Sequence, residues 1–382
     1  MSEEELNDDI NIEDDGENTA KKISKSNKDL LESPFEDIKE PEYILTGNTG
    51  VDLALSDGKG LPVGCSVLLW AEPGCGKTTL VADLAVRLIN IHKANNIPFK
   101  VLYLAVEGSR QLMYSLGLRE YMLSKDFIYV EKPLCWRQVE TFYNAILNKA
   151  PQYKDVKMIV IDSVQNVLSD ANKDKSVADG DFGTRPKERG NFYSKYLPLC
   201  KEKGITNFLI SQVRVKQGTV PGQDSRRVAA SYGDKHNVDV ILKCGKSTSR
   251  NETKKEVIKT VFGSKEETKR FVMTMTSNAA DCKNRYVDGT AAEVLIEKGV
   301  GVLNWYAIYK ILEANKFIKQ TGGWYSFNKH LCEAFGLPEK KMHKEEIGEI
   351  IKSKEPELIE FLRGVNCYAI QPNDEVIDSI ES

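Results

Sequence analysis

The feature that most constrains this chain is a glycine-bearing turn between an apolar stretch and a helix-like one. The apolar stretch is 66–70, the turn is 71–79 and the helix-like stretch is 80–90. A phosphate chain needs inward-pointing backbone N–H groups, which glycine's freedom in φ and ψ allows, and a helix N-terminus that faces the anion. Gly74 and Gly76 supply that freedom. The pattern predicts a strand, a phosphate-binding loop and a helix, in that order.

The turn matches a Walker A motif except at its first position, where Ala71 replaces the usual glycine. A methyl group is the smallest possible change, and the alternative is a chance turn that carries a surface lysine. In the Walker A interpretation, Lys77 reaches the β- and γ-phosphates of a nucleotide and the Thr78 hydroxyl binds Mg²⁺. The predicted nucleotide-binding residues of the turn are Glu72, Pro73, Gly74, Cys75, Gly76, Lys77, Thr78 and Thr79.

The composition indicates a chain that can bury a large core. Of its 382 residues 41% are hydrophobic, and the formal net charge is −3, which neither favours nor excludes nucleic acid because a basic surface can coexist with a neutral sum. No segment approaches the ~20 apolar residues of a membrane span, and the acidic start lacks signal-peptide character, so we expect a soluble, intracellular protein without a membrane partner. The eight cysteines include no C-x-x-C pair, which favours neither zinc nor a disulfide framework.

After the phosphate loop, apolar strands alternate with amphipathic stretches. Buried strands separated by helical segments are typical of an α/β fold, with a mostly parallel sheet flanked by helices. Nucleotides bind such sheets at the carboxyl ends of the strands. The expected strands are Val101–Val106, Phe127–Val130, Met158–Ile161, Asn207–Ile210 and Val238–Lys243.

Three of these strand ends carry polar groups suited to nucleotide hydrolysis. Glu107 is placed to orient or deprotonate an attacking water. Asp162 follows four apolar residues, as in a Walker B site whose carboxylate holds the Mg²⁺ shell. The neutral amide of Gln212 suits a hydrogen bond to the γ-phosphate. Each residue alone could be an ordinary exposed strand end, but together, behind a phosphate loop, they favour hydrolysis.

Two segments between the strands, 170–190 and 213–234, contain glycines and basic residues. Such loops can wrap a phosphate backbone without reading bases, and the alternative is a solvated charged face. The second segment follows Gln212 directly, so a sensor of the γ-phosphate joined to a basic segment would form a switch. The candidate DNA-binding residues are Arg185, Lys187, Arg189, Arg214, Lys216, Arg226 and Arg227.

Taken in order, these motifs resemble those of the RecA recombinase family. The resemblance implies a RecA-type P-loop ATPase core followed by a small C-terminal α/β domain. We therefore expect an acidic, largely disordered arm with a short helix at 1–43, the core at 44–302, and the small domain with an acidic tail at 303–382. The matching stretches are Ile44–Leu55, Gly60–Gly64, the phosphate loop, Val106–Tyr114, Ile161–Val164, Ser211–Gly218, Gly299–Gly301 and Trp324–Phe327.

The resemblance also implies roles for single residues. ATP and Mg²⁺ are the expected cofactors, with Thr78 and Asp162 at the metal. Tyr114 is expected to stack on adenine. Phe182 stands about where the family places an apolar residue of a DNA loop, which could wedge between bases, or it is a local hydrophobic anchor. The expected catalytic residues are Glu107, Lys77 and Gln212.

Some stretches depart from the family pattern. Bacterial members place two lysines at the neighbouring subunit's ATP, whereas the corresponding stretch 276–283 ends in a single Lys283, with Arg285 nearby. The polar run 246–270 resembles an insertion and has no assigned role. The N-terminal arm is short and acidic where bacterial members carry a basic helix. These departures indicate a divergent, phage-type member of the family, cytoplasmic and associated with DNA.

The leading hypothesis is an ATP-dependent homologous recombinase. As a DNA-dependent ATPase it would form homo-oligomeric helical filaments on single-stranded DNA and exchange strands with a homologous duplex, with a single-strand-binding protein and a loading mediator as further partners. One alternative is a ring-forming motor or helicase of the same fold. Another is a recombination mediator that binds ATP and DNA without strand exchange, although Glu107, Asp162 and Gln212 argue against it.

Overall fold

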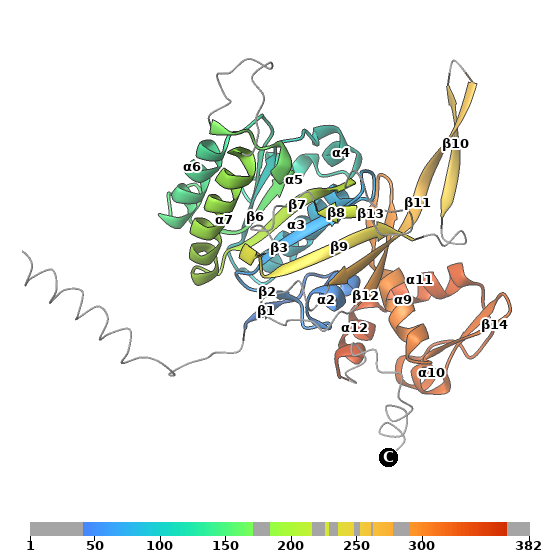
Figure 1. Cartoon of the computed structure of the whole chain (residues 1–382). Coiled ribbons are helices and arrows are strands. Elements are labelled where there is room, and N and C mark those ends of the chain that lie inside the picture. Colours follow the sequence, from blue (N-terminus) through green and yellow to red (C-terminus); the bar gives the residue numbers. More distant parts are fainter. Residues whose placement is uncertain are drawn as a thin grey trace, which may run out of the picture. The chain divides into compact units, whose positions relative to one another are not determined.

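The computed structural model contains one large sheet with helices on both faces (Figure 1). This 11-stranded sheet has the order β13-β12-β11-β9-β3-β7-β6-β4-β5, with β10 beside β11 and β8 beside β7, and β1-β2 and β14-β15 form two small sheets of their own. The structure describes residues 41–170, 184–215, 226–228, 236–247, 253–260, 263–277 and 291–364. The predicted arm up to residue 40, the acidic tail, Phe182, Lys216, Lys283 and Arg285 lie outside these ranges.

The centre of the sheet is parallel, which confirms the α/β class predicted from the sequence. Neighbouring strands from β9 to β5 run in the same direction. Because the carboxyl ends of parallel strands meet at one edge, the segments after β3, β4, β6 and β7 lie together there. The central strands are β3 (Ser66–Ala71), β4 (Lys100–Ala105), β5 (Phe127–Val130), β6 (Val156–Asp162), β7 (Thr206–Val215) and β9 (Val240–Lys246).

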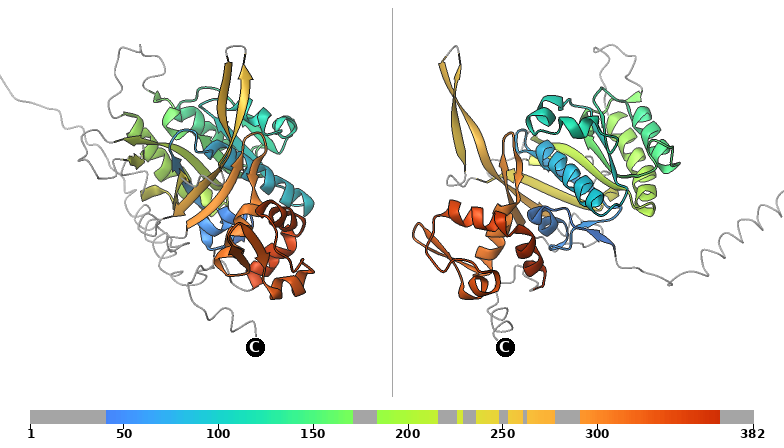
Figure 2. Two further views of the ribbon diagram at one scale, coloured as in Figure 1. Left: turned by 90° about the vertical axis from the view of Figure 1, so that its right-hand side faces the viewer. Right: turned by 180° about the vertical axis from the view of Figure 1, so that it is seen from behind.

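Alternate side chains of the central strands face two different hydrophobic clusters. On β3, Val67 belongs to one cluster and Leu68 to the other. The first cluster includes apolar residues of α3 (Lys77–Ala94), and the second includes those of α6 (Trp136–Leu147) and α7 (Thr184–Glu202). The two-residue period of a strand therefore explains why helices cover both faces (Figure 2).

One edge of the sheet is antiparallel and carries a long hairpin. β11 (Gly263–Ser277) pairs with β9 on one side and with β12 (Ala291–Glu297) on the other, and β13 (Gly301–Leu303) pairs with β12. β10 (Lys254–Thr260) pairs with the first half of β11, and this ribbon projects from the sheet in Figures 1 and 2. The polar run 246–270, whose role the sequence left open, therefore contributes the end of β9 and most of the hairpin.

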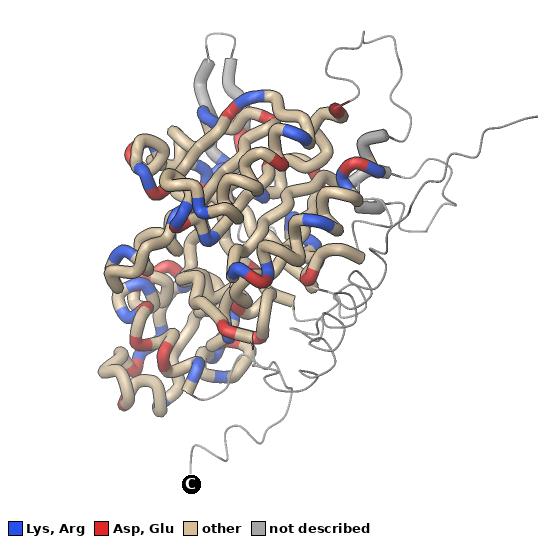
Figure 3. The backbone as a smooth tube through the Cα atoms, turned by 90° about the vertical axis from the view of Figure 1, so that its left-hand side faces the viewer, with Lys and Arg blue, Asp and Glu red and all other residues tan. Residues whose placement is uncertain are grey.

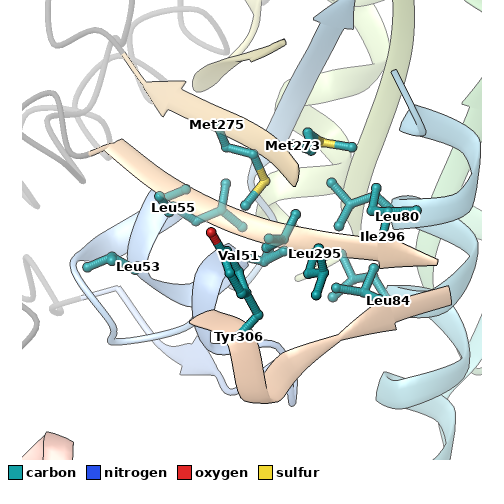
Figure 4. Close-up of a cluster of buried hydrophobic side chains, with 14 of the residues drawn as sticks. Val51, Leu53, Leu55, Leu80, Leu84, Met273, Met275, Leu295, Ile296 and Tyr306 are labelled. Carbon is teal, nitrogen blue, oxygen red and sulfur yellow. The ribbon is translucent and has the colours of Figure 1, made fainter. Parts of the chain in front are cut away.

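Beyond this edge, helices share a hydrophobic core with the sheet. α2 (Thr49–Ser56) and α9 (Asn304–Ala314) both contact β12. Val51, Ile296 and Tyr306 from these three elements lie in one buried cluster (Figure 4). The remaining elements are β1 (Tyr43–Ile44), β2 (Leu61–Pro62), α4 (Arg110–Ser115), α5 (Arg119–Leu123), η1 (Val164–Asn166), β8 (Arg226–Val228), β14 (Ile318–Thr321), β15 (Trp324–Phe327), α10 (Lys329–Phe335), α11 (Lys344–Ser353) and α12 (Glu355–Gly364).

In the described part of the chain, no helix has both the length and the apolar character needed to cross a bilayer.

A buried carboxyl group on α2 makes the stability of this core depend on pH. Asp52 is 5% exposed, and its Oδ1 accepts hydrogen bonds from the hydroxyl of Thr46 at 2.6 Å and from the backbone N–H of Thr46 at 3.1 Å. Burial raises the pKa of Asp52 from 3.8 to about 7, although the bonds from Thr46 act in the opposite direction. The folded chain therefore keeps a proton that the unfolded chain releases, so stability falls as the pH rises from about 4 to about 7.

We expect Asp52→Asn to remove this dependence, because asparagine keeps the oxygen acceptor and does not ionise. At pH 8 the variant should be more stable to urea by roughly 2–4 kcal/mol, and near pH 4 the gain should disappear. Urea unfolding at both pH values measures this. Asp57→Asn, at the left-handed C-cap of the same helix, is the matched control. An equal gain at both pH values would show that the ionisation of Asp52 does not limit stability.

Candidate nucleotide-binding site

The phosphate loop connects β3 to α3, as its sequence predicts. Gly74 and Gly76 have φ angles of 72° and 85°, in the left-handed region that residues with side chains rarely adopt. A Cβ on Gly76 would also lie 2.6 Å from Cδ1 of Ile296 and 3.2 Å from Cζ of Phe271. Glycine is therefore required at position 76 both by the backbone conformation and by the close approach of β11 and β12 beneath the loop.

Lys77 is the first residue of α3, and its ammonium group lies against the loop backbone. Nζ donates hydrogen bonds to the carbonyl oxygens of Ala71 and Glu72, both at 2.9 Å. The residue is 8% exposed, and this burial lowers the pKa of Lys77. Because its hydrogen-bond partners are neutral carbonyls, its charge is well suited to neutralise a phosphate beside the N-terminus of α3.

Thr78 and Asp162 meet across the ends of α3 and β6. Thr78 Oγ1 donates to Asp162 Oδ2 at 2.8 Å, and the buried Tyr103 hydroxyl donates to the same oxygen at 2.9 Å. Burial raises the pKa of Asp162, although both hydrogen bonds act in the opposite direction. A hydroxyl and a carboxylate held this close fit Mg²⁺, which takes few protein ligands and completes its shell with phosphate and water oxygens. When bound, the metal would neutralise charge on the phosphates.

Glu107 lies between Ser163 and Gln212. One carboxylate oxygen, Oε2, accepts a hydrogen bond from Ser163 Oγ at 3.0 Å. The other, Oε1, accepts one from Gln212 Nε2 at 2.8 Å. The backbone N–H of Gln212 in turn donates to Oε1 of Gln165 at 3.2 Å. The Glu107 carboxylate therefore joins the ends of β4 and β6 to Gln212 of β7, at the sheet edge where the sequence predicted these residues to meet.

These residues line one cavity of about 950 Å³. Its wall includes Gly74, Gly76, Lys77, Thr78, Glu107, Asp162 and Gln212, together with Pro73 and Thr79. Tyr114 lies on α4 and is 49% exposed, whereas the lining residues of this segment are Arg110, Gln111, Leu112 and Leu116. Stacking of Tyr114 on adenine stays a prediction. Cys75, another predicted residue, is buried within the phosphate loop. The backbone carbonyl of Glu72, in the same loop, accepts a hydrogen bond from Lys77.

Comparison with known proteins agrees with this arrangement. Residues 58–218, which run from before the phosphate loop to just beyond β7, match the family model described as an AAA domain. Protein RecA of Haemophilus ducreyi is 22% identical over 294 residues, covering 75% of this chain and 69% of that protein. Protein RecA of Laribacter hongkongensis is 24% identical over 298 residues, covering 75% and 73%. Over about three quarters of its length, the chain is therefore similar to proteins named RecA.

The similarity extends to proteins of a second name. DNA repair protein RadA of Aquifex aeolicus is 29% identical over 236 residues, covering 62% of this chain and 46% of that protein. The chain thus spans about half of that relative and about seven tenths of the RecA proteins. The matched stretch has the fold of a RecA-type P-loop domain, and the relatives carry more than one name.

The candidate DNA-binding residues that the structure describes fall into two groups. Arg185, Lys187 and Arg189 lie on α7, which begins at Thr184, so the first predicted loop ends earlier than residue 190. Pro186 fits the first turn of that helix, where its missing N–H costs nothing. Lys187 is exposed, but Arg189 is only 6% exposed, which leaves it little surface for a DNA contact.

The second group lies on two paired strands. Arg214 belongs to β7, which therefore continues past Gln212, and Arg226 and Arg227 belong to β8. The strands are antiparallel, with Arg214 opposite Arg227. Along the described part of the chain, Lys and Arg are interspersed with Asp and Glu (Figure 3).

Three site residues were missed by sequence reasoning. Tyr103 lies within β4, where the sequence pattern indicates an ordinary core residue, but its hydroxyl donates a hydrogen bond that orients Asp162. Ser163 and Gln165 follow the Walker B strand and hydrogen-bond Glu107 and Gln212. Ser163 could have been predicted from its position next to Asp162. Nothing in the sequence pointed to Tyr103 or Gln165, because their hydrogen-bond partners are distant in sequence.

Proposed function

We propose that this chain is an ATP-dependent homologous recombinase, a DNA-associated ATPase that assembles as helical filaments on single-stranded DNA and pairs it with a homologous duplex. The observation that supports it most is the 2.8 Å hydrogen bond from Gln212 to Glu107. It joins the residue expected to activate water to the strand that leads into the basic segment. The relatives named RecA and RadA agree with a role in recombination and repair.

We expect strands β7 and β8 to connect the nucleotide site to the candidate DNA-binding residues. Gln212 lies on β7, and two residues later Arg214 is paired with Arg227 of β8. A shift of the Gln212 side chain toward a γ-phosphate would break its bond to Glu107 and move this two-stranded ribbon. Nucleotide state would then set how the ribbon meets a DNA backbone.

In hydrolysis the chain's own groups have separate tasks. Lys77 and the N-terminus of α3 bind the phosphates, and Thr78 with Asp162 holds Mg²⁺. Glu107 accepts a proton from the attacking water. Its Oε2 is held by Ser163, and its Oε1 becomes available to the attacking water once Gln212 turns toward the γ-phosphate.

Electron microscopy tests the proposed class directly. The purified chain is mixed with long single-stranded DNA and a slowly hydrolysed ATP analogue, beside a sample without nucleotide. We expect continuous helical filaments only with nucleotide. Closed rings would favour a motor or helicase, and isolated particles along the DNA would favour a mediator; either result contradicts the proposal.

The double variant Arg226→Ala, Arg227→Ala tests the proposed DNA contact. If both guanidinium groups contact the backbone, the slope of log affinity against log salt should fall by about 1.4 on single-stranded DNA. Fluorescence anisotropy over a salt series measures the slope. Lys93→Ala, Lys203→Ala removes the same charge near the C-termini of α3 and α7, and should leave it unchanged. Equal slopes for both double variants would remove β8 from the DNA surface.

A further inference from the structure

The proposed nucleotide site has a second cation beside its phosphate loop, outside the Walker motif. Lys246 is the last residue of β9, where it pairs in register with Met273 of β11. It lines the same cavity as Lys77 and Thr78. A Cβ built on Gly74 would lie 4.0 Å from Nζ of Lys246. The ammonium group therefore stands next to the part of the loop whose backbone would follow a phosphate chain.

The position of this ammonium group is fixed by an aromatic ring. Nζ of Lys246 lies 4.8 Å from the ring centroid of Phe271 on the neighbouring strand. The ring also packs beneath the phosphate loop, since its Cζ would lie 3.2 Å from a Cβ on Gly76. A cation above an aromatic face is attracted by the ring quadrupole, so the flexible lysine side chain is held toward the loop.

The other cations of the cavity wall outside the Walker motif already have carboxylate partners. Arg110 pairs with Glu131 at 2.6 Å, and Lys298 pairs with Glu267 at 2.5 Å. Lys246 makes no ion pair with another described residue. Its full charge therefore faces the cavity beside the phosphate loop, where an anionic ligand gains most from it.

We propose that Lys246 is a phosphate-binding residue of the nucleotide site, acting within the same chain and from the side of Gly74, whereas Lys77 acts from inside the loop. This inference rests on the proposed ATPase function and assigns a ligand role to a residue of the antiparallel edge. Because β9 continues toward the β10–β11 hairpin, it also gives that edge a direct contact with the nucleotide.

The test compares Lys246→Met with Lys246→Arg. Methionine keeps the aliphatic contact with Phe271 and removes the charge, whereas arginine restores the charge. Affinities are measured for Mg-ATP and for inorganic tripolyphosphate, which carries the phosphates without the base. We expect Lys246→Met to weaken both ligands by about five- to tenfold, and Lys246→Arg to stay within about twofold of the unaltered chain.

Lys243→Met is the matched control, because Lys243 lies on the same strand, stands over the Trp70 ring and is not part of the cavity wall. It should bind both ligands normally. Thermal unfolding of each variant shows that the fold is kept, and Lys246→Gln, which also removes the charge, takes the place of Lys246→Met if the methionine variant does not fold.

Separate outcomes distinguish this inference from the proposed function. If Lys246→Met binds both ligands normally while Lys77→Ala loses them, the inference is wrong and the nucleotide site stands. Loss of ATP affinity without loss of tripolyphosphate affinity would assign Lys246 to the base and also overturn it. Normal nucleotide binding by Lys246→Met, combined with weaker binding of single-stranded DNA, would also overturn the inference. If the unaltered chain binds neither ligand, the proposed function fails as well.

Discussion

Lys77→Ala is expected to abolish measurable ATP binding and, with it, nucleotide-dependent assembly on DNA. The ammonium group lies against the loop backbone, bonded only to neutral carbonyls of Ala71 and Glu72 among the hydrogen bonds that the structure shows for it. Its removal leaves the phosphates without the charge at the start of α3. Charge-assisted phosphate contacts are strong, and we expect a loss of at least about 100-fold in affinity.

Equilibrium binding of a fluorescent ATP analogue measures this loss, and electron microscopy with single-stranded DNA measures assembly. Lys93→Ala is the matched control, because it removes a lysine from the other end of α3. Assembly of the Lys77→Ala variant to the same extent as the unaltered chain would show that this loop does not serve the nucleotide.

Glu107→Gln is expected to lower ATP hydrolysis by about 10²- to 10³-fold while ATP binding changes little. Glutamine keeps the size of the side chain and an oxygen that accepts from Gln212, but it cannot take a proton from water. The residue touches neither Lys77 nor Thr78 by any hydrogen bond that the structure shows, so the phosphate contacts should persist. The variant should therefore form filaments that do not disassemble.

Phosphate release in single-turnover experiments measures hydrolysis, and the binding assay above measures affinity. Glu202→Gln, at the C-terminus of α7, makes the same chemical change far along the chain from the site. Equal loss of binding and hydrolysis in Glu107→Gln would mean that the carboxylate organises the site without acting as a base.

The sequence predicted those parts of the site that depend on local pattern. The phosphate loop was predictable because its glycines, lysine and threonine are consecutive. Glu107, Asp162 and Gln212 were predictable because the carboxyl ends of parallel strands share one edge. The segment 170–190 was interpreted as a loop from its glycines and charges, whereas its end, from Thr184 on, belongs to α7, in whose first turn Pro186 is tolerated.

Contacts made between strands could not be predicted in this way. Tyr103 reaches Asp162 only because β4 and β6 are neighbours in the sheet, and Lys246 reaches the phosphate loop only because β9 lies beside β3. A single sequence does not reveal the order of the strands in a sheet or which faces of its elements pack together. The antiparallel edge was missed for the same reason. Its polar strand β10 pairs with β11 of the same hairpin, and the sequence does not reveal that pairing.

The side chains packed against Gly76 determine how far this protein can be shortened. They belong to Phe271, Met273 and Ile296, all C-terminal to the stretch 58–218 that matches the AAA domain. Ile296 in turn lies in the cluster that includes Tyr306 of α9. A fragment trimmed to the matched stretch would keep every Walker residue and lose the surface on which the loop rests. The catalytic unit is therefore longer than its motifs, and truncation should stop no earlier than α9.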